Sequence, residues 1–273
     1  MGISFNINLM IENKDLKILI KAAHAGGEVL KKYFGQSMDL VEKSTIADFQ
    51  TKADLESEKS ILAILKTEFP KYNIFSEEEG KINNNSQYTL VIDPLDGTNN
   101  FVLGVPTFSV SIALLYKNEA VAGVVYHPII NQTYHATKGG GAYLNEREIK
   151  VNNILDPKKI TIIYTCGYKI EYNYFSRVMS SLCSKGCKRI INNWSAAFEY
   201  CMLASGKVES VITDGIEIHD FAAGKLIALE AGAKIIDFTG KGEKEYINTK
   251  FIVSNTDEIN EYVLGIIKPL QKS

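Results

Sequence analysis

Two aspartates three residues apart, Asp93 and Asp96, stand where a strand is expected to end in a sharp turn. Residues 89–92 before them are apolar and largely β-branched, which is typical of a buried strand. Pro94 fixes its own φ and favours extended backbone at Asp93, and Gly97 permits a tight turn. The two carboxylates can therefore converge on one point.

Buried carboxylates are costly unless a metal ion, a cationic side chain or water meets their charge. Hard oxygen ligands of this kind favour Mg²⁺ or Mn²⁺ over zinc. A simpler interpretation stays open at this point, in which Asp96 caps a turn as a local Asx or N-cap residue.

Two further acidic positions precede expected chain reversals: Glu77, which opens a run of three glutamates, and Asp220, at an expected helix start. With Asp93 and Asp96 they make four carboxylates. Such a set could bind two Mg²⁺ ions about 4 Å apart, which orient a water and stabilise a leaving oxygen in phosphate-ester hydrolysis. The alternatives are a solvated glutamate run and an Asp220 that only complements a helix dipole.

The elements that would position these acids alternate between helical and strand patterns. Helices are expected over 15–34, from Asp54 to just before Pro70, and over 171–184, 196–204 and 219–231. Strands are expected over 89–92, 108–116, 120–127, 160–165 and 208–212. Turns are expected at 117–118 and 139–141, and the helix from His219 should be amphipathic, with Gly232 as its C′ residue. The mixture points to α/β or α+β layers rather than a helical bundle or a β-barrel.

Length and composition narrow the class of protein. The 273 residues suffice for one large domain or two packed halves, and the net charge of −2 without a broad basic field argues against nucleic-acid binding. The N-terminal apolar stretch is short and interrupted by Asn and Glu, so we expect neither a signal peptide nor a membrane span. The four cysteines fit no zinc pattern, and free buried thiols in a cytoplasmic protein are expected.

Several motifs, in order, resemble the inositol monophosphatase family of metal-dependent, lithium-sensitive phosphatases. The run 93–101 reads DPLDGTNNF, against the family signature D-P-[IL]-D-G-T-x-N-F. Glu77-Glu78 matches the family's upstream E-E motif. The run Asp220 through Gly224 matches D-x-A-A-G, and the run Gly139 through Asn145 matches G-x-G-A-x-x-N. Lys43-Ser44, together with Asp48, Thr51 and Asp54, matches K-S…D-x-x-T-x-x-D. The resemblance covers most of the chain.

The resemblance implies a fold and an activity. The fold would be an α+β, αβαβα layered sandwich of the sugar-phosphatase type, in a single domain over 1–273 with an N-terminal α+β half of about 1–155 and a C-terminal α/β half of about 156–273. The protein would be a cytoplasmic, homodimeric, Mg²⁺-dependent phosphoric monoester hydrolase with two or three ions in each active site, Mn²⁺ being a possible substitute. Its substrate would be a small phosphorylated polyol or sugar: myo-inositol monophosphate, fructose-1,6-bisphosphate, or both, as in archaeal dual enzymes.

The resemblance also assigns metal ligands. Glu77, Asp93 and the Leu95 carbonyl would hold a first ion. Asp93 would bridge to a second ion, which Asp96 and Asp220 complete, and Asp96 would lie closest to the substrate.

Further roles carry over to neighbouring residues. Thr98 with Glu77 would orient the metal-bound water that attacks phosphorus, and the backbone amides of Gly97 and Thr98 would grip the phosphate if they begin a helix. Lys43 and Asp54 would support the site. A surface position for Lys43 and a helix N-cap role for Asp54 remain alternatives.

Substrate choice in this family is read largely from the second half of the chain. Residues 194–197 resemble the family's G-[ST]-A-A segment, so Ser195 and Ala196 are expected to line the substrate pocket. Trp194 stands where glycine is common, and it either packs in the core or narrows the pocket.

Other positions depart from the family pattern and leave the substrate open. Animal enzymes place a glutamate that contacts inositol hydroxyls where this chain has Thr213; the neighbouring Asp214 either substitutes for it or caps a turn. His219 replaces the usual tryptophan and is expected to be a packed or surface residue. Lys169 and Arg189 could meet a second phosphate, although a surface role fits each. The alternative substrates are 3′-phosphoadenosine 5′-phosphate and NADP, and a regulatory protein without turnover is a further alternative.

Overall fold

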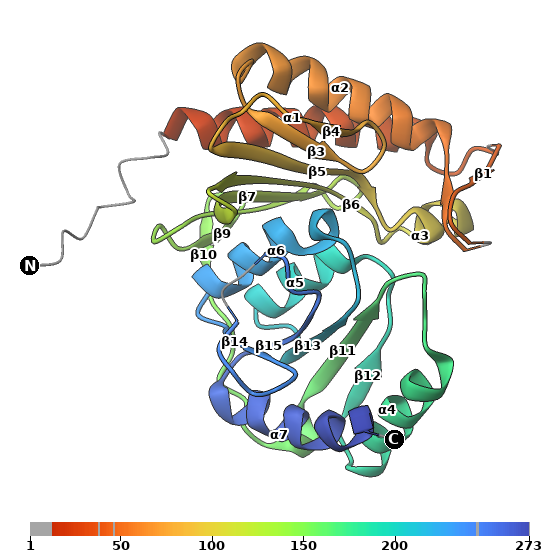
Figure 1. The fold of residues 1–273 in the computed structure, drawn as a ribbon, viewed down its shortest axis with the longest axis vertical. Coiled ribbons are helices and arrows are strands. Elements are labelled where there is room, and N and C mark those ends of the chain that lie inside the picture. The colour runs from red at the N-terminus through yellow and green to blue at the C-terminus, as the bar shows by residue number, and fades with distance from the viewer. Residues whose placement is uncertain (1–12, 38, 46, 244–245, 273) are drawn as a thin grey trace, which may run out of the picture.

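Helices and sheets alternate in the order αβαβα in the computed structural model, which describes residues 13–37, 39–45, 47–243 and 246–272 (Figure 1). The helices are α1 (Asn13–Tyr33), α2 (Lys52–Glu68), α3 (Thr98–Leu103), α4 (Tyr172–Ser184), α5 (Ala196–Ala204), α6 (Ile218–Glu230) and α7 (Asp257–Ile267), with 3₁₀ turns η2 (Pro157–Lys159) and η3 (Lys268–Lys272). The strands of the first half are β1 (Val41–Glu42), β2 (Phe49–Gln50), β3 (Asn73–Ser76), β4 (Gly80–Ile82), β5 (Tyr88–Asp96), β6 (Ser109–Tyr116), β7 (Glu119–His127), β8 (Gln132–Thr137), β9 (Ala142–Leu144) and β10 (Arg147–Ile149). Those of the second half are β11 (Thr161–Cys166), β12 (Arg189–Ile191), β13 (Ser210–Asp214), β14 (Lys234–Asp237) and β15 (Lys250–Ser254).

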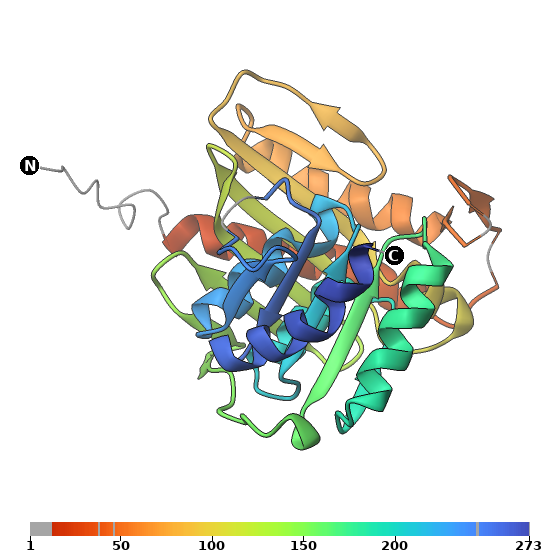
Figure 2. The same cartoon turned by 60° about the horizontal axis from the view of Figure 1, so that its bottom comes forward.

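Two sheets carry the architecture. The larger has eight strands in the order β10-β9-β8-β7-β6-β5-β3-β4, and the smaller has five in the order β12-β11-β13-β15-β14. Helices α1 and α2 cover the outer face of the large sheet, α5 and α6 lie between the two sheets, and α4 and α7 cover the far face of the small sheet (Figures 1 and 2). The expected α+β layered sandwich is confirmed.

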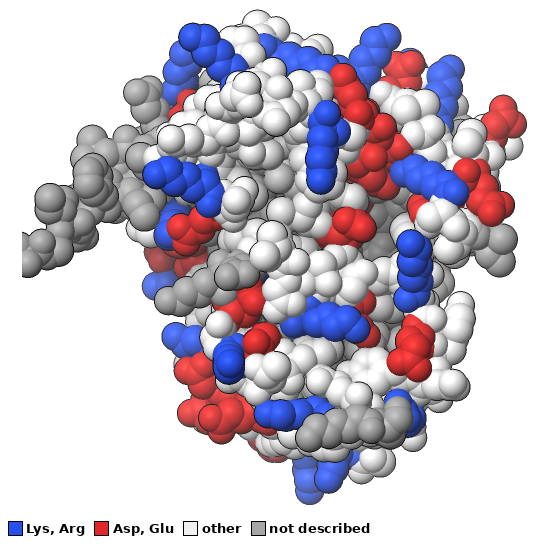
Figure 3. Space-filling view, in the orientation of Figure 1, with Lys and Arg blue, Asp and Glu red and all other residues white. Residues whose placement is uncertain are grey.

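Three apolar cores fill the spaces between these layers. One lies between α1, α2 and the large sheet, the second surrounds α5 and α6, and the third joins the small sheet to α4 and α7. Most charged side chains lie on the outside, and both signs are interspersed on the face drawn in Figure 3, but several acids are buried. No helix among the described ranges is long and apolar enough to cross a bilayer, and the N-terminal apolar stretch lies outside those ranges.

Several sequence predictions hold in detail. Strands β6 and β7 pair in antiparallel fashion through a turn at Lys117 (φ 49°) and Asn118 (φ 65°), as the two-residue hairpin required. Gly139 and Gly141 also adopt positive φ in the expected turn, and Gly232, at φ 98°, follows the end of α6.

Two expectations need correction. Helix α6 is not amphipathic: residues 221–228 are all buried, because this helix is packed between two sheets and has no solvent face. The four cysteines are free, as expected, but Cys183 is exposed while Cys201 is buried.

Close packing of the middle layer gives a stability test. A Cβ added at Gly224, in α6, would lie 2.9 Å from the carbonyl oxygen of Ala197 and from the Cβ of Tyr200 in α5. At Gly265, in α7, the same atom meets nothing within 4 Å. We expect Gly224→Ala to lower the free energy of unfolding by about 1–3 kcal/mol through overpacking, and Gly265→Ala to raise it by up to about 1 kcal/mol. Urea denaturation of both variants checks this, and equal effects would contradict the packing of α5 on α6.

Candidate functional site

A β-bulge brings the two aspartates of the central motif together. Asp93 pairs with Ser111 and Asp96 pairs with Ser109, so three steps along β5 match two along β6. In a regular strand, residues three apart point to opposite faces, and one extra residue returns them to the same face. Pro94, which has no N–H to donate, fits this interruption of the ladder. The strand therefore continues to Asp96, and does not end at residue 92 as predicted.

The turn after the bulge opens a short helix. Gly97 caps α3 with a φ of 93°, and a Cβ there would lie 3.1 Å from the carbonyl oxygen of Thr107, so glycine is required on both grounds. Thr98, the first residue of α3, is buried, and its hydroxyl lies 3.0 Å from the Leu95 carbonyl and 3.2 Å from Oδ1 of Asp54. Thr98 thus ties the Leu95 carbonyl to helix α2.

The first turn of α2 is docked onto the end of β5. Thr51 is the N-cap, and Asp54 is the third helical residue of a capping box, in which its Oδ2 accepts from the Thr51 amide at 2.8 Å. The alternative of Asp54 as the N-cap itself is therefore wrong by three residues. Ser57 donates to the Pro94 carbonyl at 2.8 Å, and burial raises the pKa of Asp54 to about 7.

Glu77 lies in the turn between β3 and β4, next to β5. Its amide donates to the Ile92 carbonyl at 3.1 Å. The same turn is held by buried Glu58, whose Oε1 accepts from the amides of Glu78 at 3.2 Å and Glu79 at 3.0 Å. The glutamate run is consequently an ordered turn rather than a freely solvated one.

Glu58 was missed by sequence reasoning, although a signal was present. Asp54, Glu58, Ile61 and Leu65 lie at helical spacing on the buried face of α2. Two acids on an otherwise apolar helical face indicate a structural or functional role for both.

Asp220 reaches the site from the other side, on the third residue of α6. Its Oδ2 accepts from the Glu217 amide at 2.7 Å in a second capping box. Asp220 therefore does act at the start of a helix, as the alternative interpretation held. This role uses only one of its two carboxylate oxygens. The other, Oδ1, lies 3.4 Å from Nε2 of His219.

Burial and the charges of the neighbouring acids contribute to the raised pKa values of the three aspartates. Burial, followed by the charges of Glu77, Asp96 and Asp220, raises the pKa of Asp93 well above its usual value. Burial raises the pKa of Asp96 to about 7 despite hydrogen bonds from Ser195 and Ser109, and that of Asp220 to about 6. A concentration of buried negative charge of this kind fits a divalent cation with oxygen ligands.

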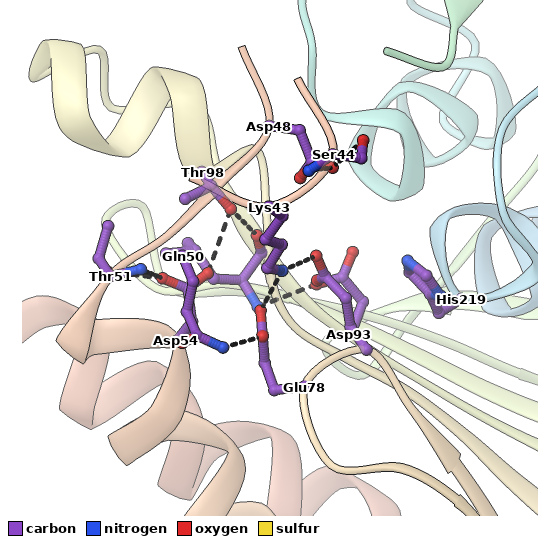
Figure 4. A network of polar contacts seen from close by, with 12 residues as sticks. Lys43, Ser44, Asp48, Gln50, Thr51, Asp54, Glu78, Asp93, Thr98 and His219 are labelled. Carbon is purple, nitrogen blue, oxygen red and sulfur yellow. Dashed lines mark hydrogen bonds and ion pairs between the residues drawn. The ribbon is translucent and has the colours of Figure 1, made fainter. Parts of the chain in front are cut away.

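Lys43 pairs with the two glutamates beside these aspartates. Its Nζ lies 2.8 Å from Oε1 of Glu77 and 2.6 Å from Oε1 of Glu78 (Figure 4). Although burial opposes it, the charge of these two glutamates raises the pKa of Lys43. Lys43 is therefore a member of the site and not a free surface lysine.

His219 joins the same cluster from the side of Asp93 away from Lys43 (Figure 4). One ring nitrogen of His219 and one carboxylate oxygen each of Glu77 and Asp93 all lie within 4.8 Å of one another. His219 is a packed histidine, as expected, with its ring edge-on to Phe75, and it also lies beside these two acids.

Asp96 is held by the second half of the chain. Its Oδ2 accepts from the Ser195 hydroxyl at 2.7 Å, the Ser109 hydroxyl at 2.8 Å and the Phe198 amide at 3.3 Å. Ser195 is fully buried and Ala196 nearly so, so in this structure Ser195 positions Asp96. Glu199, a second buried acid that sequence reasoning missed, accepts from the Asn193 amide at 3.2 Å and so fixes the turn before Ser195. Its signal was a single acid in an otherwise apolar helix.

The structure does not bring Thr213 to the site. Thr213 is fully buried in β13, and its hydroxyl is hydrogen-bonded to that of Tyr200. Its side chain is enclosed in this structure, and the alignment-based expectation that it contacts a substrate stays a prediction. Asp214 is bound by the Tyr164 hydroxyl at 2.5 Å and by Lys250 at 2.8 Å.

Asp214 and Lys169 line a cavity of about 210 Å³ in the second half of the chain. None of the four clustered acids lines that cavity. Arg189 is exposed in β12, and Trp194 is 57% exposed at a φ of 53°, so Trp194 is not a core residue.

Comparison with known proteins gives a consistent result. A profile described as "Inositol monophosphatase family" matches residues 12–272. The "Nus factor SuhB" of Pasteurella multocida is 34% identical, covering 94% of this chain and 97% of its own.

Solved structures agree with the sequence relatives. The inositol monophosphatase (IMPase) of Thermotoga maritima superimposes with a TM-score of 0.86 at 29% identity, over 96% of this chain and 99% of its own. An archaeal inositol monophosphatase–fructose 1,6 bisphosphatase gives a TM-score of 0.77 at 31% identity, over 95% and 100%.

The charge cluster predicts a pH-dependent effect on stability. Because folding raises the pKa of Asp93, the folded protein loses stability as the pH rises from the ordinary aspartate value through the folded pKa. Asp93→Asn removes that loss.

We therefore expect Asp93→Asn, in EDTA at pH 8, to melt above the wild type, with a smaller difference at pH 5. Calorimetry measures both. Asp156→Asn, at the exposed cap of η2, is the control and should melt like the wild type. A less stable Asp93→Asn variant at pH 8 would contradict the electrostatic argument.

Proposed function

The chain belongs to the inositol monophosphatase family, and from this premise we propose that it is a Mg²⁺-dependent phosphomonoesterase acting on a small polyol or sugar phosphate. The substrates we propose are myo-inositol monophosphate, fructose-1,6-bisphosphate, or both. The convergence of Glu77, Asp93, Asp96 and Asp220 carries this proposal. Their mutual charge, expressed in the raised pKa values of the three aspartates, supports the binding of divalent cations.

We assign the ion ligands residue by residue. Glu77, Asp93 and the Leu95 carbonyl would hold one Mg²⁺. Asp93, Asp96 and Asp220 would hold another, and Asp93 is the shared ligand. When bound, Mg²⁺ stabilises charge on phosphate oxygens and lowers the pKa of a water molecule.

The chain's own groups supply orientation. Asp54 accepts a hydrogen bond from Thr98, which leaves lone pairs of the Thr98 oxygen to accept from a water, and we assign Thr98 and Glu77 to hold the attacking water. The amides of Gly97 and Thr98 are assigned to the phosphate. Ser195 positions Asp96 through its 2.7 Å hydrogen bond.

Substrate choice is the finer part of the proposal. The archaeal relative is named for both inositol monophosphate and fructose 1,6-bisphosphate activities, and that supports a dual activity here. Lys169 beside the 210 Å³ cavity is the candidate for a second phosphate. Hydrolysis of 3′-phosphoadenosine 5′-phosphate or NADP remains the alternative, which a substrate panel separates.

A second candidate function is regulatory. A relative with 34% identity over nearly its whole length is named a Nus factor, and this chain could share that role with or without turnover. The presence of every proposed ligand acid favours an active enzyme, because a protein without turnover gains nothing from a cluster that costs stability.

Phosphate release gives the direct test. With Mg²⁺ and inositol-1-phosphate or fructose-1,6-bisphosphate, we expect Asp93→Asn to lose at least about 100-fold in kcat/KM, because it removes the shared ligand. Asp156→Asn should keep wild-type activity. Activity in EDTA, or an active Asp93→Asn variant, would sink the mechanism.

We also propose a cytoplasmic homodimer. Exposed apolar side chains gather where α3 ends: Leu103 is 66% and Val105 is 39% exposed. Trp194 stands beside them, since Asn100 of α3 donates to the Asn193 carbonyl at 2.6 Å. Apolar surface of this kind is typical of protein–protein contacts.

Light scattering tests the dimer. The wild type should have twice the 30.4 kDa mass of one chain, and Leu103→Lys should shift it toward the monomer. Leu55→Lys, at a 47% exposed position of α2, should remain dimeric. A monomeric wild type would refute this part of the proposal.

A further inference from the structure

We propose that His219 is an additional ligand of the metal centre, and that it shifts the preference of this centre from Mg²⁺ toward Mn²⁺ or a similar first-row transition ion. The inference rests on the metal site of the proposed function. It concerns a residue that departs from the family pattern, since tryptophan is usual at this position.

The position of the imidazole is the first observation. One ring nitrogen lies within 4.8 Å of carboxylate oxygens of both Glu77 and Asp93. Donor atoms about 2.1 Å from a common ion lie up to about 4.2 Å apart. A small side-chain adjustment would thus bring the three groups onto one ion.

The hydrogen bonding of the ring is the second observation. Nδ1 of His219 is buried and has no hydrogen-bond partner among the described residues, whereas Nε2 lies 3.4 Å from Oδ1 of Asp220. A proton on Nε2 would face the Asp220 carboxylate and leave the lone pair on Nδ1. A metal ion on that lone pair would satisfy both nitrogens, in the carboxylate–histidine–metal arrangement common in proteins.

Packing explains only part of the placement of the His219 ring. The ring contacts Phe75 edge-on, with centroids 6.0 Å apart, and the His219 side chain is 11% exposed. An apolar ring would make the same contact without placing a nitrogen among three carboxylates. A buried polar atom without a partner normally costs free energy, so its presence here points to an absent partner.

The chemistry of the donor sets the expected metal. Mg²⁺ prefers oxygen ligands and octahedral hydration, whereas imidazole suits the first-row transition ions. A centre of two carboxylates and one imidazole should therefore discriminate between the two classes of ion more strongly than an all-oxygen centre.

Metal titration of the chelator-treated, untagged protein tests the proposal. By calorimetry, we expect His219→Phe to weaken Mn²⁺ binding about tenfold or more, since even outer partners of metal ligands cost 10–100-fold, and to change Mg²⁺ binding less than about threefold. His219→Trp should behave like His219→Phe. His135→Phe, which changes another histidine with an unpartnered Nδ1, should bind both ions like the wild type.

Pulsed EPR of the Mn²⁺-loaded wild type provides a measurement that needs no variant. Coupling of the Mn²⁺ electron spin to a directly bound imidazole nitrogen is expected, and it should persist in His135→Phe and vanish in His219→Phe. Absence of that coupling in the wild type, or equal loss of Mn²⁺ and Mg²⁺ affinity in His219→Phe, would overturn the proposal.

The test of His219 as a metal ligand can succeed or fail independently of the test of phosphatase activity. The titration contains no phosphate ester, so a protein that releases no phosphate can still show the nitrogen coupling. Conversely, an active phosphatase whose Mn²⁺ lacks a nitrogen ligand would leave the proposed function intact and reject the role of His219.

Discussion

Repulsion among buried carboxylates is the constraint on which the rest of the structure depends. Asp93, Asp96 and Asp220 have raised pKa values because burial and their neighbours penalise the charged forms. A chain free to relax would separate these groups. It cannot, because each acid is fixed by its own backbone: a β-bulge for Asp93 and Asp96, and a helix capping box for Asp220. The site is therefore preorganised at a cost in stability, as is common for functional sites.

The surrounding layers offset part of that cost. Lys43 pairs with Glu77 and Glu78 of the β3–β4 turn, and the hydroxyls of Ser109 and Ser195 donate to Asp96. These partners come from a hairpin, a strand and a helix start, so the site depends on the docking of both halves of the chain. Helix α6 has a particular part in this, since it is buried between the two sheets and carries both His219 and Asp220.

Much of the fold could be predicted from the sequence where local rules decide the conformation. The hairpin at Lys117-Asn118 and the helix over residues 196–204 follow from turn chemistry and apolar spacing. The bulge could not be predicted in this way, because it depends on the register between β5 and β6. The burial of α6 on all sides is likewise a property of layer packing, which hydrophobic periodicity does not encode.

The same distinction applies to the site. Motifs identified the acids, but the burial of Thr213 became visible only with its strand in place. The spacing of Glu58 on its helix was a signal in the sequence, but its hydrogen bonds to the Glu78 and Glu79 amides became visible only with that helix docked. The proximity of His219 to Glu77 and Asp93 joins three separate elements, so no local pattern could reveal it. Long-range contacts of this kind decide which of the suitable residue types work together.

The central claim is that Asp93 is a ligand shared by two ions. Anomalous diffraction from crystals grown with Mn²⁺ tests it directly. The account predicts two anomalous peaks in contact with Asp93, one beside Glu77 and the other between Asp96 and Asp220. A single peak that does not touch Asp93, or no peak within the carboxylate cluster, would contradict it.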